Sequence, residues 1–139
     1  MFKLRKVNTF LAVIIGWLGG SVVNAGLINI GHIVFPLEGI DTDDMDALAE
    51  IMPTLGFEFF IFPFLAHAIG TFAGALLASV FALNNQLRAS MIVGFVFLLG
   101  GIAVNFIIPS TIWFLWADLL IAYIPMAWLG YKLGHKIIL

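Results

Sequence analysis

Four long runs of apolar residues, almost free of charge, decide what this chain can fold into. They cover residues 7–35, 57–83, 90–108 and 111–133, and each has about the 20 residues that an α-helix needs to cross a bilayer. Of the 139 residues, 63% are hydrophobic and 10% are charged, whereas a soluble domain carries about a quarter charged residues. The sequence therefore predicts an all-α polytopic membrane protein. The whole chain, 1–139, would form one integral membrane domain with four transmembrane helices in one bundle.

Charged residues are sorted between the two ends of the predicted helices. Four crossings put both termini on one side, and all six Lys and Arg fall on that side, in the two tails and the turn at 84–88. Six of the eight acidic residues fall in the single long loop at 36–55 on the other side. By the positive-inside rule, both termini and the turn are cytoplasmic and the acidic loop is outside.

The first run has a rival interpretation as a cleaved signal peptide. Its basic start, its apolar stretch and the sequence Val23-Asn24-Ala25 before Gly26 resemble a signal peptide with a cleavage site. However, residues 26–35 stay apolar beyond that point and would have no purpose after cleavage, which favours an uncut first helix. Cleavage would leave three spans and would put the termini on opposite sides.

The acidic loop is expected to contain a short surface helix. Asp41 or Thr42 can cap this helix, and its early Asp43 and Asp44 suit the positive helix N-terminus. Its apolar side would lie on the membrane surface or on the bundle. This side holds Met45, Leu48 and Met52. The acidic residues lack the ligand spacing of an EF-hand, so a solvated acidic face is favoured over a calcium site.

The second run carries a ladder of small residues at every fourth position. On a helix these residues form one bare face on which another backbone can lie closely. The third run adds two glycines of the same kind. The predicted packing residues are Ala66, Gly70, Gly74, Ala78, Gly94 and Gly101. Four short helices packed in this way leave little interior for a solute path, so we expect a homo-oligomer or a complex with another membrane protein.

Each predicted helix carries one strongly polar residue at a similar depth. Counting at about 1.5 Å per residue places all of them roughly 21–26 Å above the cytoplasmic boundary. These residues are Asn24, His67, Asn105 and Asp118. One interpretation is a polar cavity open to the outside, in which Asp118 and His67 pair or exchange a proton, because an unpaired charge at that depth is costly. The other is an interhelical hydrogen-bond clamp that fixes packing without transport or catalysis.

Three further polar residues are secondary candidates. Thr71 lies one turn below His67, whereas His32 lies near the outer end of the first helix. Glu58 lies nine residues before His67, half a turn out of phase, so the two do not meet unless a proline kinks the helix. Together with Asp118, these histidines and Glu58 have metal-ligand chemistry. Their spacing does not demand a metal, and none is predicted.

Several function classes find no support in the sequence. The chain has no cysteine, so it offers no disulfide framework and no thiolate chemistry. It also has no nucleotide-binding glycine loop, no nucleophile elbow and no zinc-protease motif. No cofactor is predicted, and the three basic residues at the start are too few to suggest nucleic acid as a partner. Pro125, in the middle of the fourth run, frees the carbonyl of Ile121 and predicts a kink.

Three segments resemble small four-helix bacterial inner-membrane proteins, a group with no assigned activity. The segments are Phe62 to Thr71, Gly100 to Ala103, and Trp113 to Met126. The resemblance covers nearly the whole chain. It implies the bacterial cytoplasmic (inner) membrane as the location, and it carries over no functional residue.

The predicted function is a choice between classes. The leading interpretation is a non-enzymatic structural or accessory membrane subunit whose polar layer specifies packing. The alternative is a small solute or ion transporter that uses Asp118 and His67. An intramembrane enzyme has the least support, because no nucleophile–base pair can be argued from the sequence.

Overall fold

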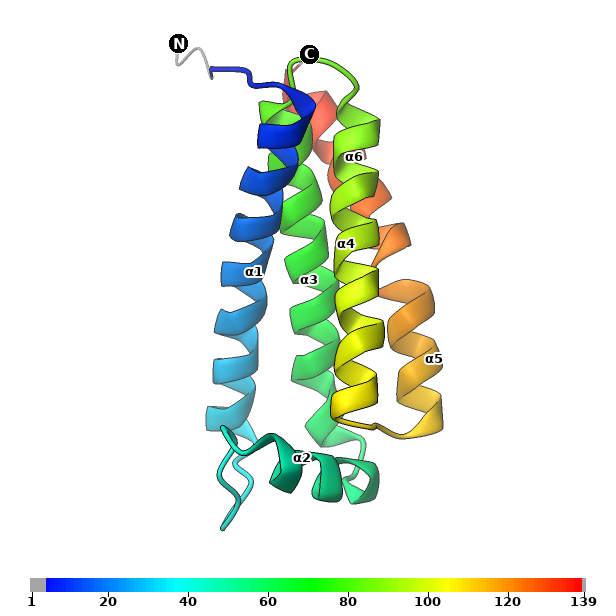
Figure 1. Cartoon of the computed structure of the whole chain (residues 1–139). Helices are drawn as coiled ribbons and strands as arrows, with labels where there is room; N and C mark the ends of the chain where they lie inside the picture. Colours follow the sequence, from blue (N-terminus) through cyan, green and yellow to red (C-terminus); the bar gives the residue numbers. More distant parts are fainter. Residues whose placement is uncertain (1–4, 139) are drawn as a thin grey trace.

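A computed structural model describes residues 5–138 of the chain and shows an all-helical protein (Figure 1). In chain order, its elements are α1 (Thr9–Val34), α2 (Met45–Ile51), the short 3₁₀ helix η1 (Met52–Thr54), α3 (Glu58–Phe81), α4 (Gln86–Ile107), α5 (Ile112–Ile121) and α6 (Ile124–Ile138). Within the described residues no β-strand forms, and one isolated bridge joins Val7 to Ala82. The predicted all-α fold is confirmed.

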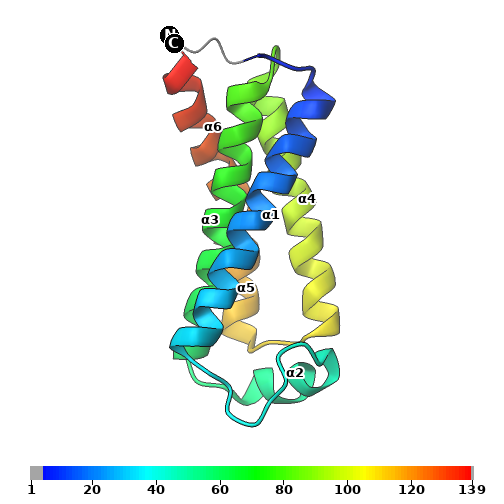
Figure 2. The same ribbon diagram turned by 90° about the vertical axis from the view of Figure 1, so that its left-hand side faces the viewer.

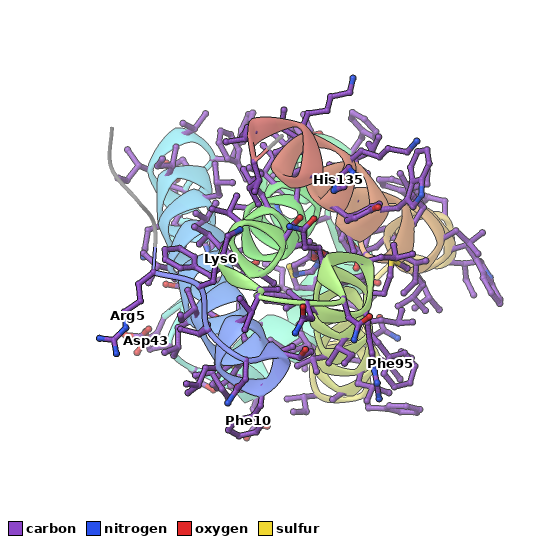
Figure 3. All side chains as sticks on the ribbon, turned by 90° about the horizontal axis from the view of Figure 1, so that it is seen from above. Arg5, Lys6, Phe10, Asp43, Phe95 and His135 are labelled. Atoms are coloured by element: carbon purple, nitrogen blue, oxygen red, sulfur yellow. The ribbon has the colours of Figure 1, made fainter. Side chains whose placement is uncertain are left out.

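Four segments are long and apolar enough to span a membrane. They are α1, α3, α4 and the stretch Ile112–Ile138, which holds both α5 and α6. Large apolar side chains cover their outward surface. Phe10 and Phe95 project from the sides of the helices (Figure 3), and Phe106 is 83% exposed. Such a surface is suited to an apolar solvent and not to water.

Helix α3 lies at the centre of the arrangement and contacts α1, α4, α5 and α6. The first and last described residues lie at one end of the molecule, whereas α2 lies across the other end (Figures 1 and 2). We call these the terminal end and the α2 end. The buried core between the helices is rich in alanine, including Ala12, Ala66, Ala75 and Ala78. Because alanine is small, the helix backbones lie close together.

Helices α1 and α3 approach closely through glycines on both helices. A Cβ atom on Gly20 would lie 2.6 Å from the carbonyl oxygen of Gly70, and one on Gly74 would lie 2.6 Å from that of Gly16. Ala78 continues the same face of α3 and also lies against Gly16. A methyl group on these glycines would overlap the facing carbonyl oxygen, so only glycine permits this approach. The small-residue ladder of α3 therefore packs against a matching ladder on α1.

Close packing also joins α4 to its neighbours. Gly94 of α4 has no room for a side chain, because Ala127 of α6 lies directly against it. In the buried interior, Ser90 Oγ donates a hydrogen bond to the carbonyl oxygen of Ala75 in α3 at 2.8 Å. Helix α4 is thus held to α6 by packing and to α3 by a buried hydrogen bond.

The fourth apolar segment is two helices and not the single kinked helix that the sequence predicted. Helix α5 ends at Ile121, residues 122–123 form a turn, and α6 begins at Ile124. Pro125 is the physical cause, because it has no N–H to donate to the carbonyl of Ile121 and its ring would clash with that carbonyl. Helix α4 also begins earlier than the predicted residue 90, since Asn85 takes a left-handed conformation (φ 54°) that closes the preceding turn.

The N-terminal segment is attached to the end of α3. Val7 donates a backbone hydrogen bond to Phe81 at 2.9 Å and accepts one from Leu83 at 2.8 Å. Lys6 Nζ donates to the carbonyl oxygen of Val80 at 2.6 Å. Carbonyl groups at the C-terminus of a helix lack partners within the helix. Here the segment before α1 supplies donors to them.

The short helix predicted in the acidic loop forms as α2, but with a different cap. Asp44 accepts hydrogen bonds from two backbone N–H groups in the first turn of α2. Asp41 accepts one from the backbone of Asp43, within the loop. The prediction of a cap at Asp41 or Thr42 is therefore wrong, because the helix begins at Met45 and its cap is the residue directly before it.

Gly74→Ala should destabilise the protein by about 1–3 kcal/mol, because the added methyl group would overlap the carbonyl oxygen of Gly16 and push α1 from α3. Gly100→Ala is the matched control, since nothing lies within 4 Å of a Cβ at that position. The measurement is the unfolding free energy of the detergent-purified protein in an SDS titration. Equal unfolding free energies for the two variants would contradict the close α1–α3 contact.

Candidate functional site

Asp118 of α5 and His67 of α3 pair in the half of the molecule nearer to the α2 end. His67 Nδ1 lies 2.8 Å from Asp118 Oδ1 and 2.9 Å from Asp118 Oδ2. Asp118 is 4% exposed, whereas the side chain of His67 is 21% exposed. The carboxylate is thus enclosed by protein, and the imidazole keeps an accessible face.

Tyr123, which the sequence reasoning missed, is the third member of the site. Its hydroxyl donates to Asp118 Oδ2 at 2.9 Å, and its ring stacks on that of His67 with the centroids 5.7 Å apart. Gly101 of α4 leaves the space for this hydroxyl, because a Cβ atom on Gly101 would overlap it. A glycine predicted for helix packing therefore packs against the site itself.

The break between α5 and α6 brings Tyr123 to Asp118. The two residues are five positions apart, and in a continuous helix their side chains would point about 140° apart around the axis. The turn at 122–123 removes this constraint. Pro125 was the available signal, but a proline alone does not tell where the residues before it will point.

Both oxygens of Asp118 are engaged when it is ionised. They accept hydrogen bonds from His67 Nδ1 and from the Tyr123 hydroxyl. A lone negative charge in an apolar interior costs several kcal/mol, and these two donors offset part of that cost. Among the described residues no side chain hydrogen-bonds to His67 Nε2. The Nε2 atom therefore has no hydrogen-bond partner within the described part of the chain.

A cavity of about 250 Å³ opens beside His67. Its walls come from α1, α3, α4 and α5, where α1 and α4 diverge toward the α2 end (Figure 2). The apolar side of α2 and η1 covers that end with Met45, Leu48 and Met52. Most of the wall is apolar or aromatic. Its polar side chains are His32, Thr42, His67, Asn105, Ser110 and Asp118.

The structure does not join the four residues of the predicted polar layer into one network. Asn105 lines the same cavity as His67 and Asp118, but its Oδ1 accepts a hydrogen bond from Ser110 at 3.0 Å. Asn24 does not line the cavity: it lies beside Gly70, and its buried Oδ1 has no hydrogen-bond partner in the described part of the chain. Counting residues gives the level of a side chain along a helix, but it does not give its direction.

The secondary candidates also lie apart from one another. Thr71 is fully buried, and its Oγ1 finds no partner among residues 5–138. Glu58 is exposed in the first turn of α3 and does not line the cavity, whereas His32 lines it from α1. No three His, Asp or Glu side chains of the described residues are placed to hold a metal ion.

The site thus consists of a paired carboxylate and an accessible imidazole, and in the described residues no hydroxyl group hydrogen-bonds to that imidazole. No protein family, curated protein or solved structure matches the chain. The resemblance to small bacterial inner-membrane proteins stays a prediction, and function has to be argued from the geometry of the site.

Tyr123→Phe should destabilise the protein by about 1.5–3 kcal/mol, because Asp118 loses a buried hydrogen bond to its charge. Tyr131→Phe, within α6, is the matched control. The Tyr131 ring stacks on His135, and its hydroxyl makes no hydrogen bond with a described residue, so we expect a change below about 0.5 kcal/mol. Both values come from SDS titration of the purified variants.

Gly101→Ala provides a second test of the same hydrogen bond. Its methyl group would displace the Tyr123 hydroxyl, so the double variant with Tyr123→Phe should lose less stability than the sum of the two single losses. Fully additive losses would show that Gly101 does not act through Tyr123.

Proposed function

We propose that this protein is an integral membrane protein with both ends of the chain on the cytoplasmic side and α2 on the outside. Its four segments of sufficient length and apolarity support this. So does the placement of charge, since the first and last described residues lie opposite the acidic loop that holds α2 (Figure 1). The lipid bilayer is then one partner of the protein. Two further proposals rest on the sequence alone: that this bilayer is the bacterial inner membrane, and that the protein forms a homo-oligomer.

Within this topology, the protein binds a small solute in the outer half of the membrane through His67 and Asp118, as a small transporter does. The observation that carries this proposal is that both members of the His67–Asp118 pair line a cavity. A pair that serves packing alone needs no cavity beside it and no accessible nitrogen. Ionisable side chains inside a membrane are costly, and they commonly mark substrate or proton pathways.

The pair can also exchange a proton without losing its geometry. If His67 gives its Nε2 proton to a bound solute, its Nδ1–H group stays hydrogen-bonded to Asp118 and keeps the ring oriented. The Tyr123 hydroxyl continues to hold the second oxygen of the carboxylate. The hydrogen bonds among the three side chains are thus kept in either protonation state of the imidazole.

A structural or accessory subunit is the second candidate, and a different observation favours it. Buried hydrogen bonds from His67 to Asp118 and from Ser90 to Ala75 each join two helices, as expected for an interhelical clamp. Such bonds contribute about 0.6 kcal/mol on average in a membrane protein, which is enough to favour one packing over another. This function requires no solute. An intramembrane enzyme has the least support, since in the described residues no hydroxyl group hydrogen-bonds to His67.

The absence of cysteine allows introduced cysteines to report the topology directly. Asp43→Cys, in the loop before α2, should react with a membrane-impermeant maleimide on intact cells. Arg88→Cys, at the terminal end, should react only after the cells are permeabilised. Both residues are exposed, so their accessibility within the protein is matched. The reverse labelling pattern would contradict the proposed orientation.

Asp118→Asn should weaken solute binding about tenfold or more and abolish uptake, because the amide replaces one carboxylate oxygen with an NH₂ group, which cannot accept the hydrogen bond from His67 or from Tyr123. Glu58→Gln makes the same chemical change at an exposed carboxyl outside the cavity and should leave both unchanged. A panel of small solutes is first screened for thermal stabilisation of the protein in lipid nanodiscs. Uptake of each hit is then measured in proteoliposomes, with size-exclusion chromatography to check assembly.

Two results would favour the clamp over solute binding. In the first, no solute in the panel stabilises the wild-type protein. In the second, Asp118→Asn assembles normally and binds and transports every hit at the wild-type level.

A further inference from the structure

We propose that residues 36–56, which carry α2 and η1, form a gate that opens and closes the cavity toward the water at the α2 end. We call these residues the gate segment. The inference rests on the proposed solute-binding function and adds the route by which a solute reaches His67. The structure shows the closed position. Opening moves the gate segment as a unit, while α1 and α3 on either side of it stay in place.

The gate segment covers the α2 end of the cavity. It lies across the ends of the long helices (Figures 1 and 2). Side chains from nearly its whole length line the cavity. They are Leu37, Thr42, Met45, Leu48, Met52 and Leu55. A solute that enters from the water at this end therefore has to displace the gate segment.

The acidic residues of the gate segment face water. All six are exposed, and none of them forms an ion pair with a described residue. Charged side chains are costly to bring into a bilayer, so the gate segment moves toward water and not into the membrane when it opens. These residues are Glu38, Asp41, Asp43, Asp44, Asp46 and Glu50.

Few contacts hold the gate segment closed. Every hydrogen bond that residues 36–55 make with the described part of the chain stays within 36–55. Leu48 is the one buried residue of α2, at 8% exposed. Displacing the gate segment thus breaks apolar contacts around Leu48 without breaking a hydrogen bond. Segments with so few buried contacts open at a low cost in free energy.

Aromatic contacts fix the chain on both sides of the gate segment. Before it, the ring of Phe35 packs against those of Phe59 and Phe62, with centroids 6.1 and 6.2 Å apart. After it, the ring of Phe57 stacks on that of Trp113 in α5, with centroids 5.4 Å apart. The movement is therefore confined to the residues between Phe35 and Phe57.

A glycine lies near each of these fixed points. Gly39 takes a left-handed conformation (φ 76°), and nothing lies within 4 Å of a Cβ at that position. Gly56 directly precedes Phe57. Hinges are a few loop residues whose backbone dihedral angles change, and glycine permits the widest range of them. The gate segment can therefore turn about both of its ends.

A single cysteine in the cavity reports opening, because the chain has no cysteine of its own. Leu115 of α5 lines the cavity and is half-buried. The full-length Leu115→Cys protein is placed in lipid nanodiscs and treated with a charged methanethiosulfonate reagent, which stays out of the bilayer. When the gate opens and closes faster than the thiol reacts, the labelling rate is proportional to the open fraction.

Leu48→Ser should raise the labelling rate of Leu115→Cys about tenfold or more, because it removes the main apolar contact that holds the gate closed. Ile51→Ser is the matched control, since it removes an aliphatic side chain of α2 that does not line the cavity. It should leave the rate unchanged. Leu48→Met keeps the size and the apolar character of the side chain and should also leave the rate unchanged.

A second cysteine position shows whether the Leu48→Ser protein is folded. Ser79 is fully buried in α3, so Ser79→Cys should stay unlabelled with and without Leu48→Ser. If Leu48→Ser exposes Ser79→Cys, the protein is unfolded, and Met52→Ser takes its place in the test. Met52 is half-buried and lines the cavity, so this variant should also raise the labelling rate of Leu115→Cys.

Two results would overturn the gate. One is an equal labelling rate of Leu115→Cys in the Leu48→Ser and Ile51→Ser proteins. The other is no labelling of Leu115→Cys by the charged reagent in any variant. If membrane-permeant N-ethylmaleimide labels the same cysteine in that case, the cavity is reached from the bilayer and not past the gate segment.

The gate and the proposed function fail separately. If labelling does not depend on Leu48 while a solute binds in an Asp118-dependent way, the gate is wrong and the proposed function stands. If labelling depends on Leu48 as expected while no solute binds, the gate stands and the proposed function fails.

Discussion

The buried carboxylate of Asp118 is the constraint on which the α2-end half of the structure depends. An ionised carboxyl group in an apolar interior needs donors, and here they come from His67 of α3 and from Tyr123 beyond the α5–α6 break. Gly101 of α4 leaves the space that the Tyr123 hydroxyl occupies. Satisfying one charge thus fixes the relative positions of three helices and of the turn between α5 and α6.

The helices pack differently in the two halves of the molecule. Toward the terminal end, glycine and alanine faces bring α1 and α3 into backbone contact, and the buried core there contains Ala12, Ala78 and Val93. Toward the α2 end, the helices diverge and leave a cavity that α2 covers. Close packing in one half lets the other half hold an opening without loss of the fold. The ion pair lies where the packed half meets the cavity, so the same side chains can serve packing and binding.

Much of the site could be predicted from the sequence, but not its full membership. Depth counting placed His67 and Asp118 at one level, and the structure brings them into contact. The same count placed Asn24 at that level, yet Asn24 lies at the α1–α3 contact and does not reach the cavity. Tyr123 was missed because its approach to Asp118 requires a helix break whose effect on side-chain direction depends on neighbouring helices. The level of a residue along a helix follows from the sequence of that helix alone. The direction in which its side chain points also depends on the neighbouring helices.

The sequence by itself determined the helical segments, their apolar length, the small-residue faces and the separation of basic from acidic ends. These features follow from local composition and from the 3.6-residue period of the helix, which act within one segment. Only the tertiary structure decided that the fourth segment divides in two, that Tyr123 joins His67 and Asp118, and that a cavity lies beside them. The physical reason is that contacts between segments depend on the rotation of each helix about its axis. That rotation is set jointly by all the helices that pack against it.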